Sequence, residues 1–172
     1  NMNNPYIYES RATTEFLWEE AIILLPDIYA QTDYSKHTAE ELASNFSRQV
    51  FLLDYFSIYT SKANTFSEND RDMVHNLMED FDGNKFVTFF DNAVGEIRNA
   101  YPKIKKLSVI GFCFGGRLAY IAGGNGLVSS VFSFYGSGAN TENYVDGKTP
   151  VEYLVSKKKN SDLSVNSFFG LN

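Results

Sequence analysis

The feature that most constrains the fold is a short apolar strand followed directly by Gly-x-Cys-x-Gly and a helical segment. The strand is predicted at Leu107–Ile110, Cys113 stands at the centre of the motif, and the helix is predicted to end at Gly123-Gly124. A strand, a tight turn and a helix in this order are typical of a nucleophile elbow. Gly111 and Gly115 leave room where the turn is tightest. The sequence therefore predicts a reactive cysteine at a helix start. The alternative is a buried, inert cysteine beside a glycine turn.

Apolar strands alternate with helical patterns along the rest of the chain. A capping box at Thr38–Glu41 opens a predicted helix, and Tyr6–Glu9 is a candidate edge strand. Strands are expected at 21–25, 49–53, 106–110, 130–135 and 164–169, a short segment at 151–155, and helices at 38–46, 67–81 and 85–101. Continuous apolar strands separated by helices indicate a parallel sheet with helices on both faces. We expect one α/β domain over residues 1–172.

Charge and cysteine content exclude several classes of function. The net charge of −6 argues against nucleic acid or an anionic membrane as a partner. One cysteine excludes an internal disulfide and suits a reducing compartment, and no stretch has the length of a membrane-spanning helix. We therefore expect a cytoplasmic protein with no secretory leader. Two histidines and one cysteine offer no zinc-type spacing, so neither a metal nor a cofactor is expected.

The residues around Cys113 resemble the elbow of the dienelactone hydrolases, the cysteine branch of the α/β-hydrolases. Gly-Phe-Cys-Phe-Gly-Gly-Arg-Leu-Ala-Tyr, at 111–120, is similar to the Gly-Tyr-Cys-Leu-Gly-Gly of that family. Leu25–Ala30 resembles the family segment Gln-Glu-Ile-Phe-Gly, and Ser130–Gly136 resembles the strand after the elbow helix. The resemblance implies an α/β-hydrolase-like fold with a mostly parallel sheet, helices on both faces and the C-terminal part missing.

The resemblance also implies a set of catalytic groups. Cys113 would attack a carbonyl carbon and form a thioester, and the backbone N–H groups of Phe114 and Ile28 would form the oxyanion hole. Asp27 stands where the family has a glutamate that contacts the nucleophile and helps to take its proton. The aspartate is one methylene shorter, which makes that contact indirect or removes it. The alternative, that Asp27 only caps a loop after a strand, stays open.

Three further residues are expected to contact the substrate. Arg71 matches a family arginine that binds the substrate carboxylate, a role that suits the guanidinium fork. His75 lies four residues later on the same helix face, where the family often has an aromatic residue lining the pocket. Tyr135 is the last residue of the strand predicted after the elbow helix. The expected substrate is a small, anionic molecule. The alternative for Arg71 is a solvated helix residue, and His37 is expected at the surface.

The family's catalytic triad is completed by an aspartate and a histidine that come later in the family pattern than residues 165–172. By that pattern the aspartate would come directly after Asn172 and the histidine further on. The chain is then either a shortened form of a longer hydrolase or a short relative that has lost turnover. We expect it to be inactive or weakly active as written.

The resemblance indicates a carboxymethylenebutenolidase-like hydrolase of small lactones or carboxylic esters. One alternative is a catalytically dead domain that binds a small molecule or a partner on the same fold. A second alternative is an amidotransferase-like cysteine hydrolase, which also uses Gly-x-Cys-x-Gly. Those enzymes often have a glutamine at the start of the following helix, which Gly115-Gly116-Arg117-Leu118 lacks.

Overall fold

The computed structural model describes residues 2–12, 15, 17–60, 62–157 and 162–169. The described strands form one six-stranded sheet in the order β1-β3-β2-β4-β5-β6. They are β1 (Ile7–Ser10), β2 (Glu20–Leu25), β3 (Gln49–Leu53), β4 (Lys106–Phe112), β5 (Ser130–Phe134) and β6 (Ser164–Phe168). Only the edge pair of β1 and β3 is antiparallel; the other neighbouring strands are parallel. The predicted mostly parallel sheet is confirmed.

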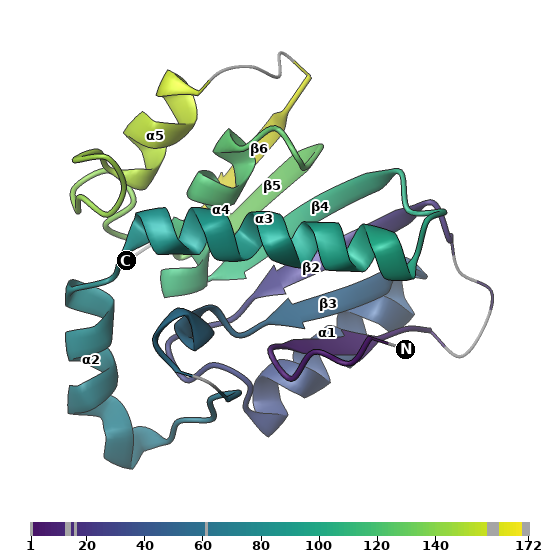
Figure 1. Ribbon diagram of the computed structural model, residues 1–172, viewed down its shortest axis with the longest axis horizontal. Helices are drawn as coiled ribbons and strands as arrows, with labels where there is room; N and C mark the ends of the chain where they lie inside the picture. The colour runs from purple at the N-terminus through teal and green to yellow at the C-terminus, as the bar shows by residue number, and fades with distance from the viewer. Residues whose placement is uncertain (1, 13–14, 16, 61, 158–161, 170–172) are drawn as a thin grey trace.

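Helices pack on both faces of the sheet, as predicted. The long helix α3 (Gly83–Ala100) and the elbow helix α4 (Phe114–Gly124) cover one face, and α1 (Asp33–Phe46) lies behind the other (Figure 1). A shorter helix, α5 (Pro150–Ser156), packs beside α4. The segment between β3 and α3 holds two 3₁₀ turns, η1 (Tyr55–Tyr59) and η2 (Glu68–Asp70), and the helix α2 (Arg71–Glu79). None of the helices in the described part of the chain has the length and apolar character needed to cross a bilayer.

The alternation of side chains along the strands divides the core between the two faces. In β2, Ile23 and Leu25 belong to the larger apolar cluster under α3 and α4, whereas Ile22 and Leu24 belong to the smaller cluster under α1. Burying an aliphatic or aromatic side chain of this size contributes about 1.5–3 kcal/mol. The larger cluster therefore supplies most of the apolar stabilisation, and it lies directly beneath the elbow helix.

Helix α1 begins earlier than its sequence suggests. The Thr32 side chain accepts a hydrogen bond from the Ser35 N–H at 3.1 Å, so Thr32, not Thr38, is the N-cap. Thr38 lies inside the helix and donates its hydroxyl to the Tyr34 carbonyl. The predicted start at Thr38 is wrong because both threonines fit a capping pattern. The extra turn at Asp33–His37 brings part of α1 beside the elbow.

Two further short segments of the chain are helical. Residues 151–155 lie within α5, which opens with a capping box formed by Thr149 and Glu152. The stretch after β3 begins with the 3₁₀ turn η1, which is capped by the Asp54 carboxylate through the Phe56 N–H. Asp54 is completely buried, and burial raises the pKa of its carboxyl although Asn64 and Phe56 donate to it.

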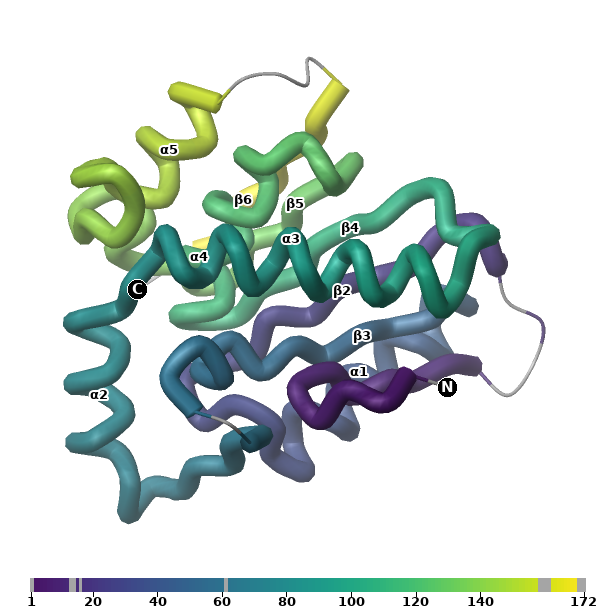
Figure 2. Tube along the Cα trace, in the orientation of Figure 1, coloured from purple at the N-terminus to yellow at the C-terminus, as the bar shows by residue number. Residues whose placement is uncertain are grey.

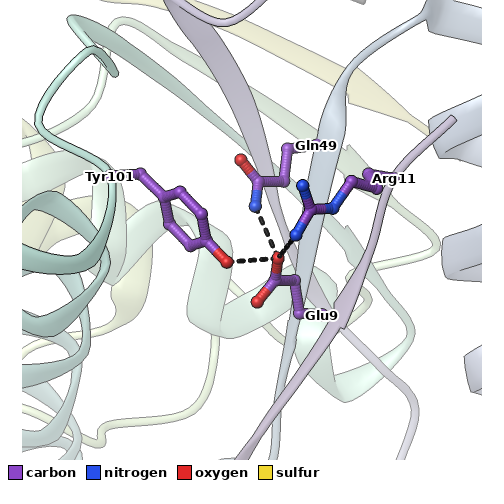
Figure 3. Close-up of polar contacts among 4 residues, drawn as sticks. All are labelled: Glu9, Arg11, Gln49 and Tyr101. Atoms are coloured by element: carbon purple, nitrogen blue, oxygen red, sulfur yellow. Dashed lines mark hydrogen bonds and ion pairs between the residues drawn. The ribbon is translucent and has the colours of Figure 1, made fainter. Parts of the chain in front are cut away.

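A polar cluster closes the amino ends of the parallel strands. One carboxylate oxygen of Glu9 accepts hydrogen bonds from Gln49 at 2.7 Å, from Arg11 at 3.2 Å and from the Tyr101 hydroxyl (Figure 3). These contacts join β1, β3 and the end of α3. Burial raises the pKa of Tyr101, and its hydrogen bond to Glu9 raises that pKa further.

The carboxyl ends of the parallel strands meet at the opposite edge of the sheet. The chain leaves β2, β3 and β4 in the same direction, and the loops that follow gather there beside α2 (Figure 2). In open α/β sheets this edge is where ligands bind. Cys113 lies at this edge, between β4 and α4.

Candidate active site

The chain turns sharply at Cys113. Its backbone angles are φ 56° and ψ −121°, a combination that side-chain-bearing residues rarely adopt and that costs on the order of 1–3 kcal/mol. A Cβ at Gly111 would lie 2.2 Å from the Gly115 carbonyl oxygen, so the two arms of the turn approach too closely for any side chain there. The strand, turn and helix predicted around Cys113 are present, and the cysteine is exposed at the apex, not buried.

Gly115 brings the elbow against the end of β2. A Cβ on this residue would lie 2.2 Å from the Leu25 carbonyl oxygen and 2.3 Å from that of Pro26. Only glycine permits this approach, which places the first turn of α4 beside the segment that contains Asp27 and Ile28. Phe114 is the first residue of α4, so its N–H has no acceptor within the helix and remains available at the elbow.

Hydrogen bonds between strand ends hold the other side of the turn. The Cys113 N–H donates to the Phe134 carbonyl at 2.9 Å, and the Tyr135 N–H donates to the Phe168 carbonyl at 2.8 Å. Tyr135 has a φ of 56° and is 59% exposed. The end of β5 thus fixes the backbone of Cys113.

A cavity of about 220 Å³ opens at Cys113, and we name it the elbow pocket. Its walls come from the ends of β2, β4 and β5 and from the first turns of α1. They are Leu24, Pro26, Asp27, Tyr34, Ser35, Thr38, Phe112, Cys113 and Tyr135. Three of the residues expected in the site therefore lie around one cavity: Cys113, Asp27 and Tyr135. The three α1 residues were missed, because the helix was predicted to start only at Thr38.

Asp27 caps the turn after β2 and also lines the elbow pocket. Its Oδ1 accepts a hydrogen bond from the Tyr29 N–H at 3.0 Å, so the side chain caps the turn after β2. The same side chain lines the elbow pocket with Cys113. One carboxylate oxygen is thus committed to the turn while the residue faces the cavity that holds the thiol. Ile28, the next residue, is 7% exposed.

The buried side chain of Tyr55 holds the turn that contains Asp27. This residue was not identified from the sequence. Its hydroxyl donates to the carbonyl oxygens of Pro26 and Asp27, each at 2.7 Å, and its side chain is completely buried. Burial raises the pKa of Tyr55 well above its usual value, and the charges of Asp27 and Cys113 raise it further. The hydroxyl therefore stays protonated at physiological pH.

Arg71 and His75 do not line the elbow pocket. Arg71 is the exposed first residue of α2, and His75 lies half-buried one turn later. A hydrogen bond to Glu68 raises the pKa of Tyr29, and the charge of Arg71 offsets part of this rise. A shallow hollow that contains Tyr29 and Glu68 adjoins the elbow pocket and shares Asp27 and Tyr34 with it.

His37 lies at the surface, as predicted. Its side chain is 65% exposed on α1 and lies 3.4 Å from the carboxylate of Glu41. Among the described residues, no group of three or more His, Cys, Asp or Glu side chains is arranged to hold a metal ion.

Comparisons with known proteins agree with this geometry. The sequence profile described as the dienelactone hydrolase family matches residues 8–164. No curated protein sequence matches the chain. A candidate dienelactone hydrolase from Klebsiella pneumoniae superposes with a TM-score of 0.59 at 14% identity, over 94% of this chain and 78% of that one.

Two further solved structures share the fold. A dienelactone hydrolase-like promiscuous phosphotriesterase from metagenomic libraries has a TM-score of 0.57 at 16% identity, over 88% of this chain and 70% of that one. An α/β serine hydrolase without a lid from Xanthomonas campestris has a TM-score of 0.58 at 11% identity, over 98% and 81%. These likenesses show an α/β-hydrolase fold.

Proposed function

The chain belongs to the dienelactone hydrolase family, and on that premise we propose that it cleaves a small carboxylic ester or lactone through a thioester on Cys113. The observation that carries the proposal is the strained elbow: Cys113 at φ 56° and ψ −121°, exposed where the elbow pocket opens. Strain of this kind persists where the surrounding structure imposes it, and it is frequent at catalytic residues.

The proposed reaction begins with acylation. The Cys113 sulfur attacks the carbonyl carbon, a C–S bond forms, and the carbonyl electron pair moves to oxygen. The N–H groups of Phe114 and Ile28 stabilise this oxyanion. When the tetrahedral intermediate collapses, the C–O bond to the leaving group breaks and the leaving oxygen takes the proton released by the thiol. Asp27, in the same cavity, is our candidate to relay that proton.

Water then attacks the thioester, releases the acid and returns the thiol. Neither histidine lines the elbow pocket, so among its residues only Asp27 is suited to activate that water. We therefore expect this chain to acylate faster than it deacylates.

The size and lining of the elbow pocket favour a small carbonyl group. Its walls carry the carboxylate of Asp27 and no basic side chain.

We propose that a substrate carboxylate, if present, lies outside this cavity, towards Tyr29 and Arg71. Arg71→Ala should then reduce acylation by a carboxylate-bearing lactone about ten- to hundred-fold relative to a neutral ester. Equal loss on both substrates would assign Arg71 a structural role.

The test is acylation of the intact chain by p-nitrophenyl acetate. We expect a burst of nitrophenolate, a mass increase of one acetyl group on Cys113, and a slow steady state. Iodoacetamide should also alkylate Cys113 in the folded protein. A thiol that is alkylated but never acylated would favour the alternative of a small-molecule-binding domain. Release of ammonia from glutamine would favour the amidotransferase-like alternative.

A further inference from the structure

The buried hydroxyl of Tyr55 lies where it can control a backbone group of the proposed reaction. It donates to the Pro26 and Asp27 carbonyl oxygens, which stand 29 and 28 residues earlier in the chain. Both carbonyls belong to the turn after β2, directly before Ile28.

The geometry of the peptide bond links this contact to Ile28. The Asp27 carbonyl and the Ile28 N–H are two ends of one peptide unit, which is planar and trans, so they point in opposite directions. Tyr55 binds the carbonyl from the buried side, and the Ala30 N–H also donates to it at 3.2 Å. With the oxygen held there, the N–H of Ile28 is directed away from the buried ring of Tyr55.

The same side chain also contacts the other half of the proposed oxyanion hole. The ring of Tyr55 packs against that of Phe114, with centroids 5.7 Å apart and planes inclined at 63°. Phe114 carries the first donor N–H, and its ring is fixed further by Phe81 at 5.1 Å. One buried residue therefore touches both segments that supply the two N–H groups.

We propose that Tyr55 is a positioning residue that sets the direction of the Ile28 N–H and its spacing from the Phe114 N–H, so that both donors meet the oxyanion. This inference rests on the proposed function. Donors that are oriented before the reaction stabilise the transition state without reorganisation, and loss of one such donor costs about 10²–10³-fold in rate. Loss of its orientation should cost part of that factor.

The test compares two reactions of one thiol. Acylation by p-nitrophenyl acetate passes through an oxyanion, whereas alkylation by iodoacetamide does not. Tyr55→Phe keeps the ring and removes the hydroxyl. We expect its acylation rate at saturation to fall about tenfold or more, with little change in the half-saturating ester concentration and an alkylation rate within about twofold of the parent.

Tyr153→Phe is the matched control. Its hydroxyl donates to Asn125, and its ring lies on α5, outside the elbow pocket. It also removes a tyrosine hydroxyl that donates a hydrogen bond, to one acceptor where that of Tyr55 has two, and should acylate at the parental rate. Tyr55→4-aminophenylalanine, which keeps a donor at the same place, should restore most of the acylation rate. This second variant decides the matter if Tyr55→Phe does not fold.

The outcomes separate the inference from its premise. If the parent acylates and Tyr55→Phe acylates equally fast, the inference is overturned and the proposed function stands. If Tyr55→Phe loses acylation and alkylation together, or if the amino variant restores nothing, Tyr55 acts on the thiol or on packing, and the inference is overturned. If the parent itself never acylates, both proposals fall.

Discussion

At the carboxyl ends of the parallel strands the backbone is bent into positive φ angles, whereas the amino ends are held by paired side chains. Ala30, Cys113 and Tyr135 have φ values of 64°, 56° and 56° shortly after β2, β4 and β5. At the amino ends, Glu9 accepts from three donors and Arg48 pairs with Glu20 at 2.8 Å. A positive φ near this end, at Ser47, is the left-handed residue that commonly ends a helix.

The two ends of the sheet serve different purposes: the carboxyl ends position the elbow, and the amino ends stabilise the fold. Strained backbone is maintained only where neighbouring structure fixes it, and here the rigid sheet supplies that support to the elbow. The amino end contributes hydrogen bonds and ion pairs between side chains. We therefore expect substitutions at the carboxyl end to change reactivity first and those at the amino end to change stability first.

The largest expected effect is loss of the thiol. Cys113→Gly should abolish acylation, by at least about 10³-fold, because the nucleophile is gone. The same change removes the Cβ from a positive φ, so the free energy of unfolding should not fall and can rise by about 1 kcal/mol. Acyl-adduct mass spectrometry and thermal unfolding measure the two effects. A large loss of stability would show that Cys113 is a packing residue.

Gly115→Ala should destabilise the structure at the carboxyl ends of the strands. The new methyl group would lie 2.2 and 2.3 Å from two carbonyl oxygens, so the elbow helix must move away from β2 at a cost of about 3 kcal/mol. Gly95→Ala on α3 is the control: its Cβ meets nothing within 4 Å, and it should stabilise by about 0.5–1 kcal/mol. Urea unfolding distinguishes them. Similar stability for both would mean that the close approach is not needed.

Glu9→Gln tests the amino end. The change neutralises the carboxylate that accepts hydrogen bonds from Gln49, Arg11 and Tyr101. It should reduce the free energy of unfolding by about 2 kcal/mol. Acylation of Cys113 should stay within about twofold of the parent. Glu41→Gln, on the exposed face of α1, should change stability by less than about 0.5 kcal/mol. A loss of acylation without a loss of stability would break the distinction between the two ends.

The smallest effect concerns alkaline pH. Burial and the bond to Glu9 raise the pKa of Tyr101, so the folded protein holds this proton more tightly than the unfolded chain. The resulting stability is present below about pH 10, the usual tyrosine pKa, and is lost as the pH rises through the folded pKa. Tyr101→Phe should therefore lose less stability between pH 9 and about pH 11 than the parent. Parallel curves would contradict this account.

The elbow could be predicted from sequence because all its determinants lie within about ten residues. The turn is indicated by Gly111, Cys113 and Gly115. The apolar strand before them indicates that the turn follows a strand of a parallel sheet. The alternation of strands and helices likewise predicted the order of the fold. Local patterns were sufficient wherever the partner residues are neighbours in the chain.

The rest of the site depends on distant contacts. Tyr55 meets Pro26 and Asp27 across almost 30 residues, and nothing in the residues beside Tyr55 indicates those partners. The position of Arg71 follows from how α2 packs through buried Val74, which the helical pattern alone does not define. The α1 wall of the elbow pocket was missed because Thr32 and Thr38 are both plausible caps, and packing of α1 on the sheet decides between them.

Hydrogen exchange can monitor the elbow through two hydrogen bonds, whose donors directly follow β4 and β5 and whose acceptors end β5 and β6. The Cys113 amide is protected by the Phe134 carbonyl, and the Tyr135 amide, one residue further on, is protected by the Phe168 carbonyl. Separation of β6 exposes the Tyr135 amide, and only a further opening between β4 and β5 exposes that of Cys113. Deuterium uptake at Cys113 therefore records how often the nucleophile loses its support, with no substrate in the pocket.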